Sequence, residues 1–143
     1  MQKNRIAIVE DNTTARINLR SHLITMENLE ISSYSNGKEL RNGLRTKNFE
    51  VIFIDFHLGQ NKNGVEWAQS LLESEILNPS TSLIFITSDR LPQTIGQILD
   101  LHPDMILLKP YTIKSVVTAL RKCLAVRSEL LPALDFLDKK NRN

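Results

Sequence analysis

The sequence contains four short apolar runs, each followed directly by polar side chains that could do chemistry. The runs are IAIV, VIFI, LIFI and MILL. The side chains that follow them are Glu10 and Asp11, Asp55, Thr87, and Lys109. A carboxylate can attack phosphorus and form an acyl phosphate. We therefore interpret Asp55 as a possible nucleophile in phosphoryl transfer.

The other four side chains have the properties that such a transfer needs. Phosphoryl transfer depends on positioning and on neutralising the charge of the equatorial oxygens. Glu10 and Asp11 offer carboxylate oxygens to Mg²⁺, which prefers a few carboxylates together with waters and phosphate oxygens. Thr87 offers a hydroxyl to one phosphoryl oxygen, and Lys109 offers a positive charge to another. Ser88 is the alternative hydroxyl, but Thr87 comes first after its apolar run, which favours Thr87.

The apolar runs predict strands that would place these side chains together. Each run is too short for a helix and rich in β-branched or bulky residues, which is typical of strands buried on both faces. If helices connect the strands, the sheet is parallel and the four polar ends lie along one edge. Open α/β sheets bind their ligands at that edge. Asp55 ends the central strand of this arrangement.

The segments between the runs have the periodicity of amphipathic helices. Asn12 or Thr13 can cap the first helix, and Pro92 can occupy the first turn of a later one. Residues 29–35 alternate weakly and predict a less buried edge strand. The predicted inward-facing helix residues are Ala15, Leu19, Leu23 and Met26; Leu40 and Leu44; Val65, Ala68, Leu72 and Ile76; Ile95, Ile98 and Leu99; and Ile113, Val116, Val117, Leu120 and Leu124.

Composition limits the classes of protein that are possible. The chain has 143 residues, 41% of them hydrophobic, which fits one domain with a single core. Its 18 basic and 16 acidic residues are scattered and give no reason to expect direct nucleic-acid binding. Cys123 is the only cysteine, which excludes an internal disulfide, and we expect it in the core. No run suits a signal peptide or a membrane span, so we expect a cytoplasmic protein that does not bind membranes.

The order of the polar residues resembles that of response-regulator receiver domains. ED follows the first run, D the central run, T the next and KP the last. Over roughly residues 3–125, the resemblance implies a flavodoxin-like, doubly wound α/β fold with a five-stranded parallel sheet in strand order 2-1-3-4-5 and five helices. It also implies that Asp55 accepts phosphate from a histidine kinase or a histidine phosphotransfer protein. Such a domain is not a conventional enzyme, because it catalyses only its own phosphorylation and dephosphorylation.

The resemblance also implies roles for further residues. The peptide bond between Lys109 and Pro110 would be cis, as proline permits. His57 and Asp89 would lie beside the water that removes the phosphoryl group, and would therefore set how long that group survives. The implied cofactor is Mg²⁺ or Mn²⁺. Its implied ligands are Glu10, Asp11, Asp55 and the backbone carbonyl of His57.

The chain departs from the receiver pattern at two places. Many receivers have an aromatic residue three positions before the lysine, as a switch coupled to the threonine, whereas this chain has Ile106. The segment after Asp55 reads HLGQNKNG, which is longer than the usual turn and demands unusual backbone conformations at its glycines and asparagines. The first departure puts the usual aromatic switch in doubt, and the second alters the shape of the loop.

Three other functions compete with phosphate acceptance. A phosphatase of the haloacid-dehalogenase kind would resemble D-x-D-x-T at its nucleophile, but His57 stands where its general-acid aspartate should be. A dinucleotide-binding domain would need G-x-G-x-x-G after the first strand, which is missing. A receiver-shaped binding module that no longer takes phosphate is the remaining alternative.

Residues 126–143 follow the predicted domain as a short amphipathic extension. They contain four leucines around Pro132 and are too few for a separate output domain. Because exposed apolar clusters usually mark contacts, we expect residues 126–137 to pack on their own domain or on a second copy. The expected partners of the chain are therefore a downstream protein or a second copy, in addition to the phosphate donor. The leucines are Leu130, Leu131, Leu134 and Leu137.

Overall fold

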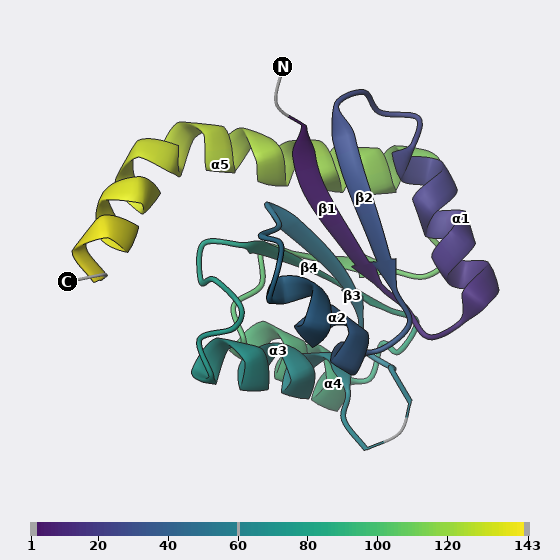
Figure 1. Cartoon of the computed structure of the whole chain (residues 1–143). Helices are drawn as coiled ribbons and strands as arrows, with labels where there is room; N and C mark the ends of the chain where they lie inside the picture. Colours follow the sequence, from purple (N-terminus) through teal and green to yellow (C-terminus); the bar gives the residue numbers. More distant parts are fainter. Residues whose placement is uncertain (1–2, 60, 142–143) are drawn as a thin grey trace.

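A five-stranded parallel sheet lies at the centre of the molecule, in the order β2-β1-β3-β4-β5 (Figure 1). The structure is a computed structural model that describes residues 3–59 and 61–141, with side chains described as far as residue 127. All strand pairs are parallel, and the predicted fold class and strand order are confirmed. The strands are β1 (Asn4–Val9), β2 (Leu29–Tyr34), β3 (Val51–Asp55), β4 (Ser82–Thr87) and β5 (Met105–Leu108).

Four helices connect the strands and a fifth follows β5, and together they cover both faces of the sheet (Figure 1). Asparagine caps start three of them, because Asn12, Asn36 and Asn63 each accept a hydrogen bond from a backbone N–H of the first turn. Glu66 completes a capping box with Asn63, and Pro92 stands at the start of its helix as predicted. The helices are α1 (Thr13–Leu23), α2 (Gly37–Leu44), α3 (Gly64–Glu73), α4 (Pro92–Asp100) and α5 (Ile113–Asn141).

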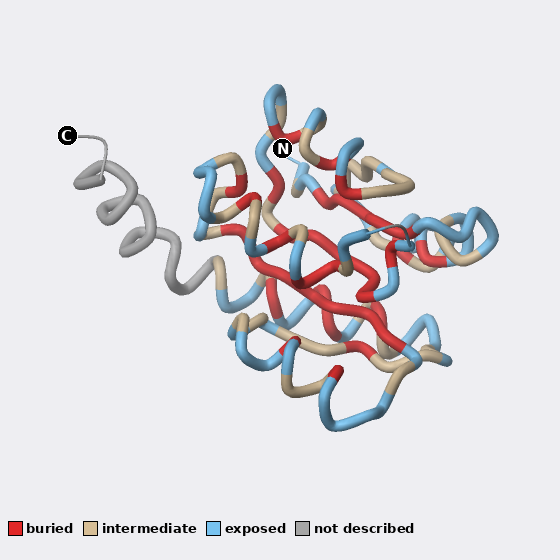
Figure 2. The backbone as a smooth tube through the Cα atoms, turned by 90° about the horizontal axis from the view of Figure 1, so that it is seen from below, coloured by how far each residue is buried: buried red, intermediate tan, exposed pale blue. Residues whose placement is uncertain are grey.

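The core consists of two apolar clusters, one on each face of the sheet. Alternate residues of a strand point to opposite faces. Ile52 and Ile54 therefore pack with α2, α3 and α4, whereas Val51 and Phe53 pack with α1 and α5. Buried backbone runs through the strands at the centre, while exposed residues occupy the loops and outer helix faces (Figure 2). Cys123 is buried in the second cluster.

Two predicted core positions were wrong. Ile98 is fully buried, but its neighbour Leu99 is 54% exposed, because successive helix residues lie about 100° apart and α4 buries only a narrow stripe. Ile113 is 51% exposed, since it is the first residue of α5 and precedes the turn that meets the sheet. Ile106 is partly buried and packs against the first cluster.

The last helix runs past the body of the sheet (Figure 1). It continues without interruption to Asn141, so the predicted domain end at residue 125 lies within it, and that boundary stays a prediction. Within α5, the Arg127 guanidinium donates a hydrogen bond to the backbone carbonyl of Ser80. The expected packing of the four leucines around Pro132 concerns side chains outside the described part. None of the described helices is both long and apolar enough to cross a membrane.

Candidate functional site

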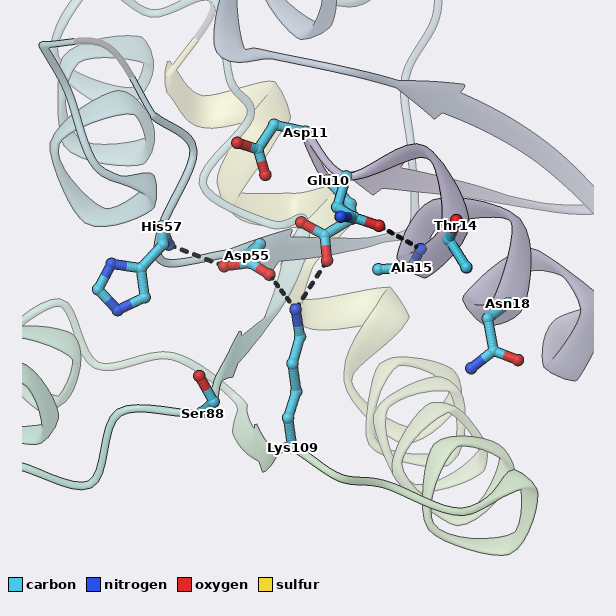
Figure 3. A pocket seen from close by; sticks show the side chains of 10 residues that line it. Glu10, Asp11, Thr14, Ala15, Asn18, Asp55, His57, Ser88 and Lys109 are labelled. Atoms are coloured by element: carbon cyan, nitrogen blue, oxygen red, sulfur yellow. Dashed lines mark hydrogen bonds and ion pairs between the residues drawn. The ribbon is translucent and has the colours of Figure 1, made fainter.

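An open cavity of about 620 Å³ lies at the carboxyl edge of the sheet, where β1, β3, β4 and β5 end. Three predicted site side chains, Glu10, Asp55 and Lys109, meet there (Figure 3). The strand order explains the meeting, because β1, β3 and β4 are adjacent and β5 follows them. The lining residues are Glu10, Asp11, Asn12, Thr14, Ala15, Asn18, Asp55, His57, Ser88 and Lys109.

Lys109 joins the two buried carboxylates of this cavity. Its Nζ donates to Oδ2 of Asp55 at 2.6 Å and to Oε1 of Glu10 at 2.7 Å (Figure 3). Both acidic side chains are 5% exposed, whereas the lysine side chain is 28% exposed. One ammonium therefore balances two carboxylates that have little access to water.

Burial and pairing shift the pKa values of these groups. Desolvation raises the pKa of Glu10 to about 7, against the hydrogen bond from Lys109, which lowers it. Burial alone would lower the pKa of Lys109, but its hydrogen bonds to Asp55 and Glu10 outweigh this effect and hold the pKa above its usual value. Lys109 therefore stays charged and supplies a permanent cation beside Asp55.

The backbone after Asp55 holds its carboxylate in place. Oδ1 of Asp55 accepts a hydrogen bond of 2.8 Å from the backbone N–H of His57. A second hydrogen bond joins the two ends of the loop after Asp55, since the N–H of Gly64 donates to the carbonyl of Phe56 at 2.7 Å. A Cβ on Gly64 would stand 2.4 Å from the carbonyl oxygen of Asp55, so only glycine allows this approach. The loop therefore closes tightly behind the acceptor.

The two hydroxyls after β4 lie in different surroundings. Thr87 is fully buried, and its Oγ1 accepts a hydrogen bond of 3.0 Å from the N–H of Asp89. Ser88 lines the cavity instead. A hydroxyl that accepts one hydrogen bond can still donate its proton to another group. Thr87 thus keeps a free donor, and its role toward a phosphoryl oxygen stays a prediction.

Asp89 connects the site with the start of α4. Its Oδ1 accepts from the N–H of Leu91 at 2.9 Å, and its Oδ2 accepts from the hydroxyl of Thr94 at 2.7 Å. The bond from Thr94 and the bond from Leu91 hold the pKa of Asp89 below its usual value. Nε2 of His57 lies 3.8 Å from the same Oδ2, so the two predicted lifetime residues are neighbours, and His57 is the one that lines the cavity.

The acidic side chains have the chemistry that a hard divalent cation needs. Glu10 follows β1 and Asp55 ends β3, and Oε1 of Glu10 and Oδ2 of Asp55 converge on one cation, the ammonium of Lys109. Asp11 is exposed and lines the same cavity. Within the described residues, no three His, Cys, Asp or Glu side chains already form a metal cluster. Mg²⁺ needs only one or two carboxylates when it keeps waters and binds phosphate oxygens, so this donor set fits it.

Sequence reasoning missed the contribution of α1 to the cavity. Thr14, Ala15 and Asn18 line the wall next to Lys109. Their spacing of three and four residues places them on one face of the helix, which was the available signal. The peptide bond between Lys109 and Pro110 is cis in the structure.

A doubly wound parallel sheet with carboxylates and a lysine at its carboxyl edge defines the class of α/β domains that bind ligands at strand ends. Residues 6–121 match the response regulator receiver domain family. The chain belongs to this family, which serves two-component signalling. It is 30% identical to the sensory transduction protein LytT of Oceanobacillus iheyensis over 94% of its own length. The chain spans about half of LytT, 55% of its length.

Solved structures show the same fold at low sequence identity. A CheY-like receiver domain protein from Methanospirillum hungatei JF-1 has 18% identity and a TM-score of 0.79, over 90% of this chain and 98% of that chain. CheY4 of Vibrio cholerae has 16% identity and a TM-score of 0.75, over 85% of this chain and 99% of that chain. RcsB of Salmonella typhimurium has 22% identity and a TM-score of 0.74, over 85% of this chain and 58% of that chain. These similarities concern the fold.

Proposed function

We propose that Asp55 accepts a phosphoryl group from the phosphohistidine of a histidine kinase or a histidine phosphotransfer protein. The observation that carries this proposal is the position of Asp55 at the end of the central strand, at an open cavity, with Lys109 2.6 Å from its Oδ2. Family membership supports the same role. LytT is named a sensory transduction protein, which also agrees with signalling.

In the proposed transfer, a carboxylate oxygen of Asp55 forms a bond to phosphorus while the bond from phosphorus to the donor nitrogen breaks. The electron pair of that bond remains on the imidazole, which leaves. Lys109 is placed to neutralise negative charge on a phosphoryl oxygen, and Thr87 retains a hydroxyl proton to donate to another. The protein acts as its own catalyst and as the substrate, both in this transfer and in the later hydrolysis of the phosphoryl group.

Glu10, Asp11, Asp55 and the backbone carbonyl of His57 would hold the divalent cation. When bound, Mg²⁺ or Mn²⁺ neutralises charge on the phosphoryl oxygens. The ammonium of Lys109 already attracts Glu10 and Asp55, and therefore competes with a cation for them. Lys109 can turn toward a phosphoryl oxygen once that group is present, because its side chain is long and partly exposed.

Phosphorylation would then change partner binding through the loop after β4. A phosphoryl oxygen that accepts a hydrogen bond from the hydroxyl of Thr87 would reorient that hydroxyl, which accepts from the N–H of Asp89, and Asp89 holds the start of α4. Because residue 106 is isoleucine, no aromatic ring takes part at that position. The expected partner is a downstream protein or a second copy. Amide exchange at residues 87–101 should therefore differ with and without beryllofluoride, a phosphoryl mimic.

Incubation with acetyl phosphate, with and without Mg²⁺, tests the proposal against its rivals. Intact-mass analysis should show one added phosphoryl group with Mg²⁺ and none after chelation. No added mass with Mg²⁺ would favour the phosphate-independent binding module. Sustained turnover of p-nitrophenyl phosphate would favour a phosphatase.

A further inference from the structure

Arg16 reaches back from the first turn of α1 to the backbone that carries the two acidic residues. Its Nη1 donates a hydrogen bond of 2.7 Å to the carbonyl oxygen of Glu10. Its Nη2 lies 3.4 Å from Oγ1 of Thr13. Arg16 as a whole is half-buried, whereas its neighbours Ile17 and Asn18 on α1 are exposed. A planar guanidinium suits this contact, because it presents several N–H groups in fixed directions.

The hydrogen bond from Arg16 is the second one that holds the backbone of Glu10 in place. On one side, the N–H of Glu10 donates to the carbonyl of Tyr34 at 3.0 Å, which ties it to the end of β2. On the other side, the carbonyl of Glu10 is held by Arg16. Asn12 then caps α1 by accepting from the N–H of Ala15 at 2.8 Å. The turn between β1 and α1, with Asp11 at its centre, is therefore anchored before and after Asp11.

We propose that Arg16 is a positioning residue for cation binding at this site. By holding the peptide between Glu10 and Asp11, it sets the direction in which both carboxylates leave the backbone. Arg16 donates to a backbone carbonyl and to a hydroxyl, and not to either carboxylate. The inference rests on the proposed function, since it assumes that these carboxylates bind a divalent cation.

Positioning and simple electrostatics predict opposite results when Arg16 is removed. Arg16 is a cation near the site, so its removal alone should strengthen the binding of Mg²⁺ through reduced repulsion. If Arg16 positions the carboxylates, its removal should weaken binding instead. Loss of a residue that orients metal ligands typically costs about tenfold or more in metal affinity. The sign of the change therefore decides between the two.

The test measures cation affinity directly, without phosphorylation. Binding of Mn²⁺ is followed by electron paramagnetic resonance of the free ion, and Mg²⁺ is measured by competition. Arg16→Ala should lower the affinity for both ions by about tenfold. Arg16→Lys, which keeps the charge and a donor group, should recover part of the lost affinity. Arg20→Ala is the matched control, because Arg20 lies one turn later on α1 but donates to Ile31 and Ser33 of β2. It should leave the affinity unchanged.

A second readout uses the metal-free protein. Amide exchange at residues 10–12 should rise in Arg16→Ala and stay at the wild-type rate in Arg20→Ala, with melting temperatures as the check on folding. If Arg16→Ala binds the cations as tightly as wild type or more tightly, or if its amide exchange is unchanged, the positioning role is overturned. The proposed function stands in that case as long as the wild-type protein binds the cations. Failure of the wild-type protein to bind either ion would overturn the inference together with the proposed function.

Discussion

Nζ of Lys109 lies 2.6 Å from Oδ2 of Asp55, although 54 residues separate them in the chain. The same nitrogen lies 2.7 Å from Oε1 of Glu10, so this contact holds together the ends of three strands. The pairing keeps the proposed phosphoacceptor oriented before any cation or phosphate arrives.

Replacement of Lys109 should lower stability and strengthen cation binding. Lys109→Met leaves Glu10 and Asp55 facing each other with little water. Breaking a deeply buried ion pair costs roughly 3–5 kcal/mol, and we expect about 1–3 kcal/mol here because Lys109 is partly exposed. In chemical unfolding without Mg²⁺, Lys109→Met should have a lower free energy of unfolding than wild type. Addition of Mg²⁺ should restore that free energy. Lys122→Met, at an exposed lysine of α5, should change neither value.

Gly64 packs closely against the backbone of Asp55, and its replacement tests this packing. Gly64→Ala places a Cβ 2.4 Å from the Asp55 carbonyl oxygen, so the strand end or the loop must shift. We expect a loss of about 1–3 kcal/mol in unfolding free energy, together with slower phosphorylation. Gly96→Ala, within α4, meets nothing within 4 Å and should stabilise the protein by up to about 1 kcal/mol. Equal stabilities for the two variants would contradict this packing.

The lifetime of the phosphoryl group should depend on His57 and Asp89. His57→Ala and Asp89→Ala should each change the hydrolysis rate by about tenfold, near 1.4 kcal/mol of barrier, without changing the extent of labelling. The reason is that His57 lines the cavity that holds Asp55, and its Nε2 lies 3.8 Å from Oδ2 of Asp89, so a change in either side chain changes the surroundings of a water that enters the cavity. Time courses of phosphate loss after donor removal measure the effect.

Asp89 also holds the start of α4, so its two roles need to be separated. Thr94→Val removes the hydroxyl that donates to Oδ2 of Asp89 but keeps the carboxylate. If the charge of Asp89 sets the lifetime of the phosphoryl group, Thr94→Val should lose that group at the wild-type rate. Decay of Thr94→Val at the rate of Asp89→Ala would show that the position of the loop matters instead.

The fold was predictable because its apolar runs are unambiguous. VIFI and LIFI contain only apolar residues and are followed directly by polar ones, which predicts two buried strands and the edge of the sheet at which they end. The inner faces of the helices were less certain. Ile98 and Leu99 are both apolar, and only contact with β4 and its neighbours decides which one is buried.

The site was predictable as a set of residues but not as a network. Glu10, Asp55 and Lys109 lie close together because each is at the end of a strand, and this does not depend on the conformation of the loops. The hydrogen bonds of Arg16 and Asp89 depend on loop geometry, for which the sequence has no periodic signal. Gly64 illustrates the same limit, because its spacing from Asp55 says nothing of the 2.4 Å approach.

Burial should protect the single thiol of the core. Desolvation and the nearby charge of Asp104 raise the pKa of Cys123 to about 11, against the opposite effect of Arg127. Its folded pKa therefore exceeds its unfolded value, so this group's contribution to stability is present below the unfolded pKa and is lost as pH rises toward 11. Iodoacetamide at pH 8.5 should modify the native protein far more slowly than the unfolded protein. Equal rates would show that Cys123 is accessible.

The most direct test of the account is the site of phosphorylation. Wild-type protein and Asp55→Asn are incubated with acetyl phosphate and Mg²⁺, and their intact masses are compared, with Asp89→Asn as a matched control. One added phosphoryl group is expected on wild type and Asp89→Asn, and none on Asp55→Asn, because Asp55 alone ends the central strand beside Lys109. Undiminished labelling of Asp55→Asn would contradict the assignment of Asp55 as the phosphoacceptor.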